Sequence, residues 1–283
     1  MYQFPIGAII ESFRMDTPAA IKKAADMGIQ GLQMYATKGE HAPENMSREA
    51  RRELLDMVKS HGLVFSALCG DLGGGYGYPE RNPALIEKSK RIMELALDLE
   101  TTVVTTHIGV VPEDPTHPRY AIMQRACKEL ADFADSMGAH FAIETGPETS
   151  ATLKTFLDSL ESKGVSVNLD PANLVMVAGD DPVVAGHNLK DYIVHTHAKD
   201  GIMIAKTNPE YIYRVVHPVP EQFEGVSYFR EVPLGEGKVH FPSYLAALED
   251  VGYRGFLTIE RECGEQPLED IQKAITHLRE TMC

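Results

Sequence analysis

The sequence predicts an α/β protein folded as a single (β/α)8 TIM barrel, with residues 1–283 forming one domain. Short apolar or β-branched runs give way to longer stretches of helical period, and this alternation occurs eight times. A length of 283 residues suits one such barrel, which typically takes about 250. A doubly wound sheet would usually carry a phosphate-binding turn after its first strand, where this chain has Glu11-Ser12-Phe13-Arg14. We therefore expect a closed barrel rather than an open sheet.

The elements follow from these patterns in order. The expected strands are runs rich in apolar and β-branched residues, at Phe4–Ile10, Gly31–Tyr35, Leu63–Cys69, Thr102–His107, His140–Glu144, Val165–Asp170, Ile193–His197 and Phe256–Glu260. The expected helices show the helical period, at Pro18–Met27, Ser47–His61, Asn82–Leu99, Arg119–Met137, Ser150–Ser162, Pro182–Leu189, Pro242–Val251 and Leu268–Thr281. Several carry end signals: Thr17 and Ser47 are expected N-caps, and Gly28, Gly62 and Gly138 are expected just past helix ends.

Two connections between these elements are unusual. The loop from Gly70 to Gly77 is rich in glycine but lacks the ending of a phosphate loop, so we expect a mobile rim loop that places Tyr76 or Tyr78 over a sugar face. Residues 200–233 join the seventh strand to its helix. A connection that long in a compact barrel predicts a functional lid.

Composition narrows the class of function. Lys plus Arg number 27 and Asp plus Glu number 41, so the formal net charge is −14. An acidic surface repels phosphate backbones and anionic lipids, which argues against nucleic-acid and membrane partners. No apolar run approaches the roughly 20 residues that span a bilayer, and no signal peptide is expected. The four scattered cysteines form no CxxC pair and suggest neither a zinc site nor disulfides, so we expect a cytoplasmic enzyme.

Candidate site residues lie where the expected strands end. The active site of a (β/α)8 barrel is built at the C-terminal ends of its strands. Five consecutive strands end in a residue that can bind a metal or a proton, at His107, Glu144, Asp170, His195 with His197, and Glu260. Structural alternatives exist, because Asp170 could cap a helix and His107 could be a core histidine. His195 and His197 share a strand face, so both point to the barrel axis or both point to the helices.

Together these side chains indicate a metal site. Burying carboxylates side by side costs several kcal/mol per ion unless a cation neutralises them. Three carboxylates and one imidazole suit Mn²⁺, Mg²⁺ or Co²⁺, with Zn²⁺ as an alternative. We therefore expect one divalent ion at the mouth of the barrel.

The chain resembles the xylose isomerase-like barrels. These include sugar-phosphate isomerases and epimerases, tagatose and psicose 3-epimerases, inosose dehydratase and, more distantly, endonuclease IV. The resemblance covers essentially the whole chain and is sharpest from Glu144 onward. It rests on five short motifs that occur in the order of the last four strands: Ile143-Glu144-Thr145-Gly146, Asn168-Leu169-Asp170-Pro171, His195-Thr196-His197-Ala198-Lys199-Asp200, Pro233-Leu234-Gly235-Glu236-Gly237 and Thr258-Ile259-Glu260.

The resemblance implies a ligand set and a chemistry. It implies that the metal ligands are Glu144, Asp170, His197 and Glu260, and that Glu144 and Glu260 also form the acid–base pair. Such a pair can remove a proton next to a carbonyl while a metal stabilises the enediolate. Returning the proton to the other face gives an epimer, and returning it to the adjacent carbon gives an aldose–ketose isomer.

Further residues are expected to contact the substrate: His107, His195, Lys199 and Asn173. His195 could instead support the metal ligands, and Lys199 could be a solvated residue that opens a loop. Asn173 stands where the ketose 3-epimerases carry a histidine, and Met203 stands where they carry an arginine. The Lys199-Asp200 pair is more similar to the isomerase and inosose dehydratase branches.

The favoured function is therefore a metal-dependent isomerase or epimerase that acts on a carbohydrate. An inosose-type dehydratase could use the same residues. An endonuclease IV-like repair enzyme is disfavoured by the acidic chain and by Asn173, where that family has a metal-binding histidine, and a non-catalytic sugar sensor ranks low because all four ligands are present. Glu236 is expected to be exposed, a dimer or tetramer is expected from the family, and a phosphate on the substrate could meet Arg14, Lys38, Lys206 or Arg214.

Overall fold

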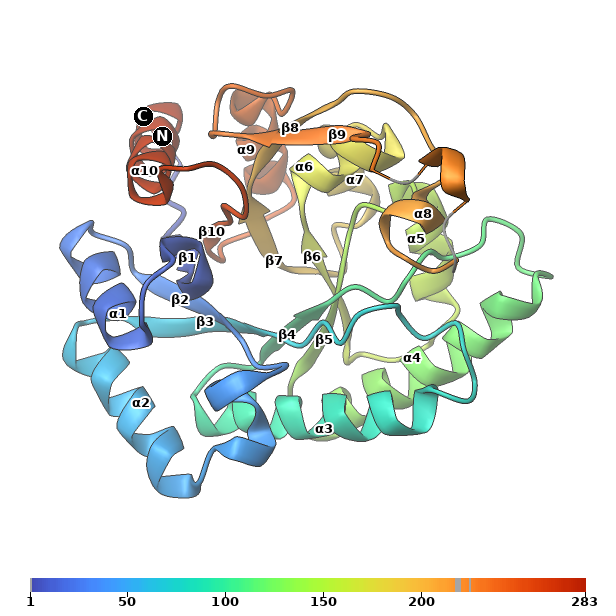
Figure 1. Ribbon diagram of the computed structural model, residues 1–283, viewed down its shortest axis with the longest axis horizontal. Helices are drawn as coiled ribbons and strands as arrows, with labels where there is room; N and C mark the ends of the chain where they lie inside the picture. Colours follow the sequence, from blue (N-terminus) through green and yellow to red (C-terminus); the bar gives the residue numbers. More distant parts are fainter. Residues whose placement is uncertain (1, 217–219, 224) are drawn as a thin grey trace.

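The chain forms a closed barrel of parallel strands in the computed structural model, which describes residues 2–216, 220–223 and 225–283 (Figure 1). Around the barrel the strands follow the order β1-β10-β7-β6-β5-β4-β3-β2, and all neighbours are parallel. This confirms the predicted single (β/α)8 TIM barrel. The strands are β1 Ile6–Ile9, β2 Gly31–Tyr35, β3 Val64–Cys69, β4 Val103–Thr106, β5 His140–Glu144, β6 Val165–Leu169, β7 Ile193–Ala198 and β10 Leu257–Ile259.

Helices follow the strands and pack outside them (Figure 1). The main ones are α1 Thr17–Asp26, α2 Arg48–Ser60, α3 Asn82–Asp98, α4 Pro118–Ser136, α5 Ser150–Asp158, α7 Pro182–Asn188, α9 Phe241–Asp250 and α10 Pro267–Met282. Each corresponds to an expected helix, although α5 ends at Asp158 rather than Ser162. The two chain ends meet at α10, where the backbone N–H of Tyr2 donates to the carbonyl of Met282 at 2.9 Å.

The helix ends follow side-chain chemistry, with one correction to the prediction. Ser47 caps α2 as expected and accepts a hydrogen bond from the N–H of Ala50 at 3.2 Å. The cap of α1 is Asp16, which accepts from the N–H of Ala19 at 2.9 Å, so the prediction that Thr17 fills this role was wrong. The carboxylate reaches a free N–H of the first turn, and Thr17 becomes the first helical residue.

The connection after β7 has a structure of its own. It contains an antiparallel hairpin of β8 (Asp200–Met203) and β9 (Phe229–Val232), the short helix α8 (Pro209–Ile212) and a 3-10 turn at Glu221–Phe223. We call residues 200–233 the lid; its residues 217–219 and 224 lie outside the described part. Shorter unpredicted elements are α6 (Pro171–Asn173) with a π-helical turn at Leu174–Ala178, and 3-10 turns at Ile10–Phe13, Gly39–His41 and Pro43–Asn45.

Polar side chains meet inside the barrel near the C-terminal ends of the strands. Gln33 of β2 contacts Thr105 of β4 and His197 of β7, which belong to strands that are not neighbours, so these side chains cross the barrel interior. The strand register also sets Asn168 beside both Glu144 and His195. Because buried polar groups need partners, the barrel fold itself orients the side chains at its mouth.

Candidate active site

Glu144, Asp170, His197 and Glu260 converge at the mouth of the barrel. Glu144 ends β5, Asp170 follows β6, His197 lies in β7 and Glu260 follows β10. Each side chain offers a ligand atom, the four atoms lie within 4.8 Å of one another, and all four residues are buried. The structure thus brings the four predicted metal ligands together, and this group could bind a metal ion.

The imidazole of His197 faces the three carboxylates through one nitrogen. Its Nδ1 lies 3.0 Å from Oε2 of Glu260, 3.3 Å from Oδ2 of Asp170 and 3.6 Å from Oε1 of Glu144. Burial alone would lower the pKa of His197, but the charges of Glu260 and Glu144 outweigh it and hold that pKa well above its usual value. Burial would raise the pKa of Glu144, but His107 and His197 outweigh burial and hold that pKa well below its usual value. The centre therefore attracts positive charge.

One oxygen of Glu260 has no hydrogen-bond partner in the described part of the chain. Its Oε2 is buried and lies 3.0 Å from Nδ1 of His197 and 3.1 Å from Nζ of Lys199, but no donor among the described residues meets it with hydrogen-bond geometry. Lys199 and His197 offset part of its negative charge, but its capacity to accept hydrogen bonds is left unused. A divalent ion among these four ligands would satisfy it, and a donor set of three carboxylates and one imidazole suits such an ion.

Asp170 has two contacts that match both interpretations of its sequence position. Its Oδ1 accepts from the N–H of Asn173 at 2.9 Å and so caps α6, while its Oδ2 faces His197. The cap holds the carboxylate in place, so helix capping and a ligand position occur together.

A second layer of polar side chains holds Glu144. Nδ2 of Asn168 donates to Oε2 of Glu144 at 3.1 Å, and Oδ1 of Asn168 accepts from Nδ1 of His195 at 2.9 Å. Nε2 of His195 pairs with the hydroxyl of Thr258 at 3.0 Å. Burial, with the charge of His197, lowers the pKa of His195 to about 3, so its ring is neutral. His195 does not line the cavity; the structure places it where it supports Asn168.

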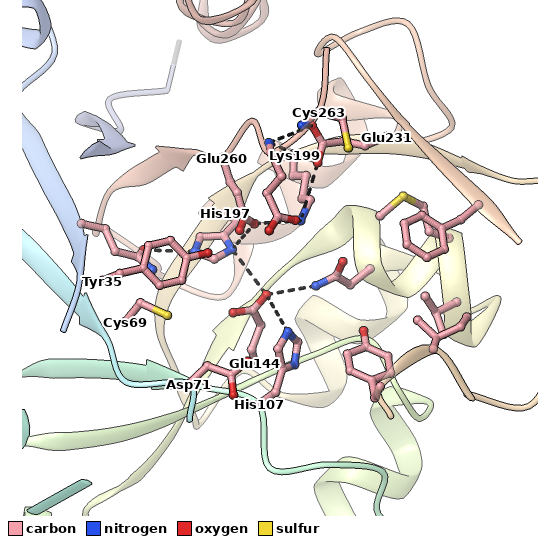
Figure 2. Close-up of a pocket in the computed structure, with 18 residues that line it drawn as sticks. Tyr35, Cys69, Asp71, His107, Glu144, His197, Lys199, Glu231, Glu260 and Cys263 are labelled. Carbon is pink, nitrogen blue, oxygen red and sulfur yellow. Dashed lines mark hydrogen bonds and ion pairs between the residues drawn. The ribbon is translucent and has the colours of Figure 1, made fainter. Parts of the chain in front are cut away.

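The other expected substrate contacts lie at the cavity. Nε2 of His107 is 3.4 Å from Oε1 of Glu144. Burial lowers the pKa of His107, but the charge and hydrogen bond of Glu144, together with the charges of Asp71 and Glu260, outweigh burial and raise that pKa to about 9. Nδ2 of Asn173 donates to the same oxygen at 3.0 Å. Lys199 is buried rather than solvated, with Nζ 2.8 Å from Glu262 and 3.1 Å from Glu260. Figure 2 shows Glu144 and Glu260 reaching the cavity from opposite sides.

The tyrosines of the glycine-rich loop do not reach the cavity, so that prediction was wrong. Tyr76 is buried and bonded to the hydroxyl of Ser89 at 2.9 Å, and the hydroxyl of Tyr78 donates to a carbonyl of the lid. Tyr35 of β2 and Tyr213 of the lid line the cavity instead, and the Tyr213 ring lies 5.0 Å from that of His107. The loop serves as an anchor for the lid.

The structure also places the remaining candidates. Arg14 donates to the carbonyls of Glu262 and Gly264, and Glu236 is exposed as expected. Three other basic residues were expected as possible phosphate contacts, and none is among the described residues that line the cavity: Lys38, Lys206 and Arg214.

Several residues at the site were missed by sequence reasoning. Gln33 and Asn168 could have been found, because each is a polar residue within a strand that is otherwise largely apolar. Tyr213 and Glu231 come from the lid, where no periodicity marks an inward-facing side chain.

The closed barrel and its buried carboxylate–imidazole cluster define a (β/α)8 protein with a potential metal centre at its C-terminal mouth. The chain belongs to the xylose isomerase-like TIM barrel family, whose sequence model matches residues 21–281. An inosose dehydratase from Lacticaseibacillus casei is 26% identical over 162 residues, which cover 55% of this chain and 52% of that protein. The chain thus spans about half the length of the curated relatives it matches.

Solved structures share the fold at low identity. A xylose isomerase domain protein from Planctomyces limnophilus is 24% identical, with a TM-score of 0.79 over 98% of this chain and 96% of that one. The probable 3-DHS dehydratase AsbF from Bacillus anthracis is 18% identical, with a TM-score of 0.75 over 98% and 99%. A D-psicose 3-epimerase studied with D-fructose is 16% identical, with a TM-score of 0.73 over 99% of each chain. No helix in the described part of the chain is both long and apolar enough to cross a membrane.

Proposed function

We propose that the protein is a divalent-metal-dependent enzyme that transfers a proton at a carbon next to the carbonyl of a carbohydrate, as an isomerase or epimerase. One observation carries the proposal: four buried ligand atoms lie within 4.8 Å of one another beside a cavity of about 360 Å³. The named activities of the psicose epimerase and inosose dehydratase relatives support it, because both act on polyhydroxylated carbonyl compounds.

The proposed roles follow from position. Glu144, Asp170, His197 and Glu260 would hold the ion, and when bound the ion would supply the positive charge that stabilises the oxyanion formed by loss of the proton. Glu144 and Glu260 reach the cavity from opposite sides (Figure 2), so one carboxylate could take the proton and the other could deliver one to the opposite face. Asn173 would orient Glu144, and His107 and Tyr213 would orient the sugar.

A dehydratase that uses the same site is the second candidate. Lys199 and His107 line the cavity, and each carries an N–H that could protonate a departing hydroxyl group after proton removal. The partial match to inosose dehydratase also favours a dehydratase.

The test is incubation of the Mn²⁺-loaded protein in D2O with free ketoses, inososes and sugar phosphates, followed by NMR and mass spectrometry. Isomerase or epimerase activity predicts deuterium at a carbon next to the carbonyl without a change in composition. Loss of one water identifies the dehydratase. The proposal fails if the loaded protein catalyses neither reaction. It also fails if the reaction observed continues at an unchanged rate in the variants Glu144→Gln and Glu260→Gln.

A further inference from the structure

The described residues that line the cavity provide no free positive charge for an anionic ligand. Of the described residues that line it, Lys199 is the only lysine or arginine. Its Nζ lies 2.8 Å from Glu262, 3.1 Å from Glu260 and 3.9 Å from Glu231. Its one charge is therefore more than balanced before any ligand enters.

The remaining sources of positive charge are also matched by carboxylates. The metal would sit among Glu144, Asp170 and Glu260, and His107 faces Glu144. The N-terminus of α6, where backbone N–H groups could otherwise bind an anion, is capped by Asp170. Sites for phosphate or carboxylate groups ordinarily use arginine, lysine or free N–H groups of this kind.

The rim of the cavity adds more negative charge and an apolar wall. Asp71, Glu231 and Glu262 line the cavity beyond the ligand cluster. Glu262 pairs with Lys199 and Glu231 with Arg261, so Asp71 is the one of the three with no ion pair to a described basic residue. Uncharged side chains of the turn after β6 and of the lid form another part of the wall: Met176, Val177, Ile212 and Phe229. These apolar groups suit the C–H surface of a sugar or cyclitol ring.

We propose that this rim makes the site selective for uncharged carbohydrates, with Asp71, Glu231 and Glu262 as the specificity-determining residues that exclude sugar phosphates and sugar acids. This rests on the proposed function for the location of the substrate. Placing a phosphate dianion among these carboxylates is repulsive, and the low dielectric of a partly enclosed cavity strengthens that repulsion.

The charge of the rim can be measured without knowing the substrate. Cys263 is exposed and lines the cavity, Cys283 is exposed at the chain end, and the other two cysteines are buried. Rates of modification by a cationic and an anionic methanethiosulfonate are compared in Cys283→Ser, which keeps Cys263, and in Cys263→Ser, which keeps Cys283. The ratio between reagents removes the effect of thiol reactivity, and Cys283 supplies the reference. Both variants are loaded with Mg²⁺.

At low ionic strength we expect the ratio of the cationic to the anionic modification rate to be about tenfold higher at Cys263 than at Cys283. Salt should reduce the preference, and Glu262→Gln and Asp71→Asn should each reduce it further. A ratio at Cys263 that Glu262→Gln and Asp71→Asn leave unchanged, or a preference for the anionic reagent at Cys263, would overturn the proposal.

A ligand experiment separates this inference from the proposed function. Binding of D-fructose and of D-fructose 6-phosphate to the Mn²⁺-loaded protein is measured at low and high salt. Tighter binding or turnover of the phosphorylated sugar overturns the selectivity while supporting the enzyme activity. A cationic preference at Cys263 with no turnover of any sugar supports the selectivity and counts against the activity.

Discussion

Oε1 of Gln33 lies 3.0 Å from Nε2 of His197 inside the barrel, and both side chains are about 1% exposed. The amide group of Gln33 donates to the hydroxyl of Thr105 at 3.1 Å, which directs Oε1 toward the imidazole. An imidazole that donates from Nε2 keeps a lone pair on Nδ1 when it is neutral. That nitrogen faces the three carboxylates. Nδ2 of Asn168 also lies 3.2 Å from Nε2, but the Gln33 contact is shorter, and we infer that Gln33 favours the tautomer that can bind a metal.

Replacing Gln33 should therefore weaken metal binding. We expect Gln33→Leu, which removes the acceptor at similar size, to raise the Kd for Mn²⁺ by about 10- to 100-fold. Gln33→Glu keeps an acceptor and should retain tight binding. Calorimetric titration measures both, and ¹⁵N NMR of the histidines reports the tautomer. Wild-type affinity in Gln33→Leu would contradict the role of Gln33.

Metal binding should stabilise the folded protein through Glu260. A ligand at 100 times its Kd contributes about 2.7 kcal/mol to the free energy of unfolding, so Mn²⁺ should raise Tm by several degrees. Glu260→Gln keeps the size of the side chain but loses its charge, and most of the rise should disappear. Differential scanning calorimetry with and without EDTA measures the shift. The exposed Glu280→Gln is the control and should respond as the wild type does; an undiminished shift in Glu260→Gln would argue against the ligand set.

Stability should depend on pH through Glu148, which follows β5. Its Oε2 accepts from the N–H of Val111 at 3.1 Å, and burial raises its pKa from 4.5 to about 8. Between these two pKa values the folded state binds more protons than the unfolded state. Glu148 therefore contributes fully to the stability of the folded state below pH 4.5, and this contribution is lost as the pH rises to 8.

Glu148→Gln should remove this dependence and be more stable than the wild type at pH 8, by at least about 1 kcal/mol. Urea unfolding at several pH values between 5 and 8 measures the difference. Parallel pH profiles for the two proteins would show that Glu148 does not titrate in this range.

Glu231 should link the lid to the strand end that carries Glu260. It lies in β9, is buried, pairs with Arg261 and accepts from the N–H groups of Glu262 at 3.1 Å and Cys263 at 3.2 Å. Glu231→Ala leaves those donors and part of the guanidinium charge without a partner. We expect a loss of about 2–4 kcal/mol in the free energy of unfolding.

The matched control for this change is Glu236→Ala, which removes an exposed glutamate between the lid and α9. It should alter stability by no more than about 0.5 kcal/mol. Urea denaturation measures both variants, and similar small losses would show that the lid is held by other contacts.

Much of the site could be predicted because it depends on local pattern and on one rule of the fold. Hydrophobic periodicity located all eight barrel strands, and parallel strands in a barrel end at the same rim. Glu144, Asp170, His197 and Glu260 therefore had to approach one another once the chain closed. The direction of a loop side chain has no such rule, which is why Tyr76 was misplaced.

The amino-acid order by itself determined which segments form strands and helices and which ligand types stand at the strand ends, because periodicity and end position are local properties. Tertiary structure alone decided that Gln33 meets His197 across the barrel and that the lid supplies Glu231 and Tyr213. These contacts join residues far apart in the chain. They arise only when barrel closure and strand register bring buried polar groups within reach of the partners that they need.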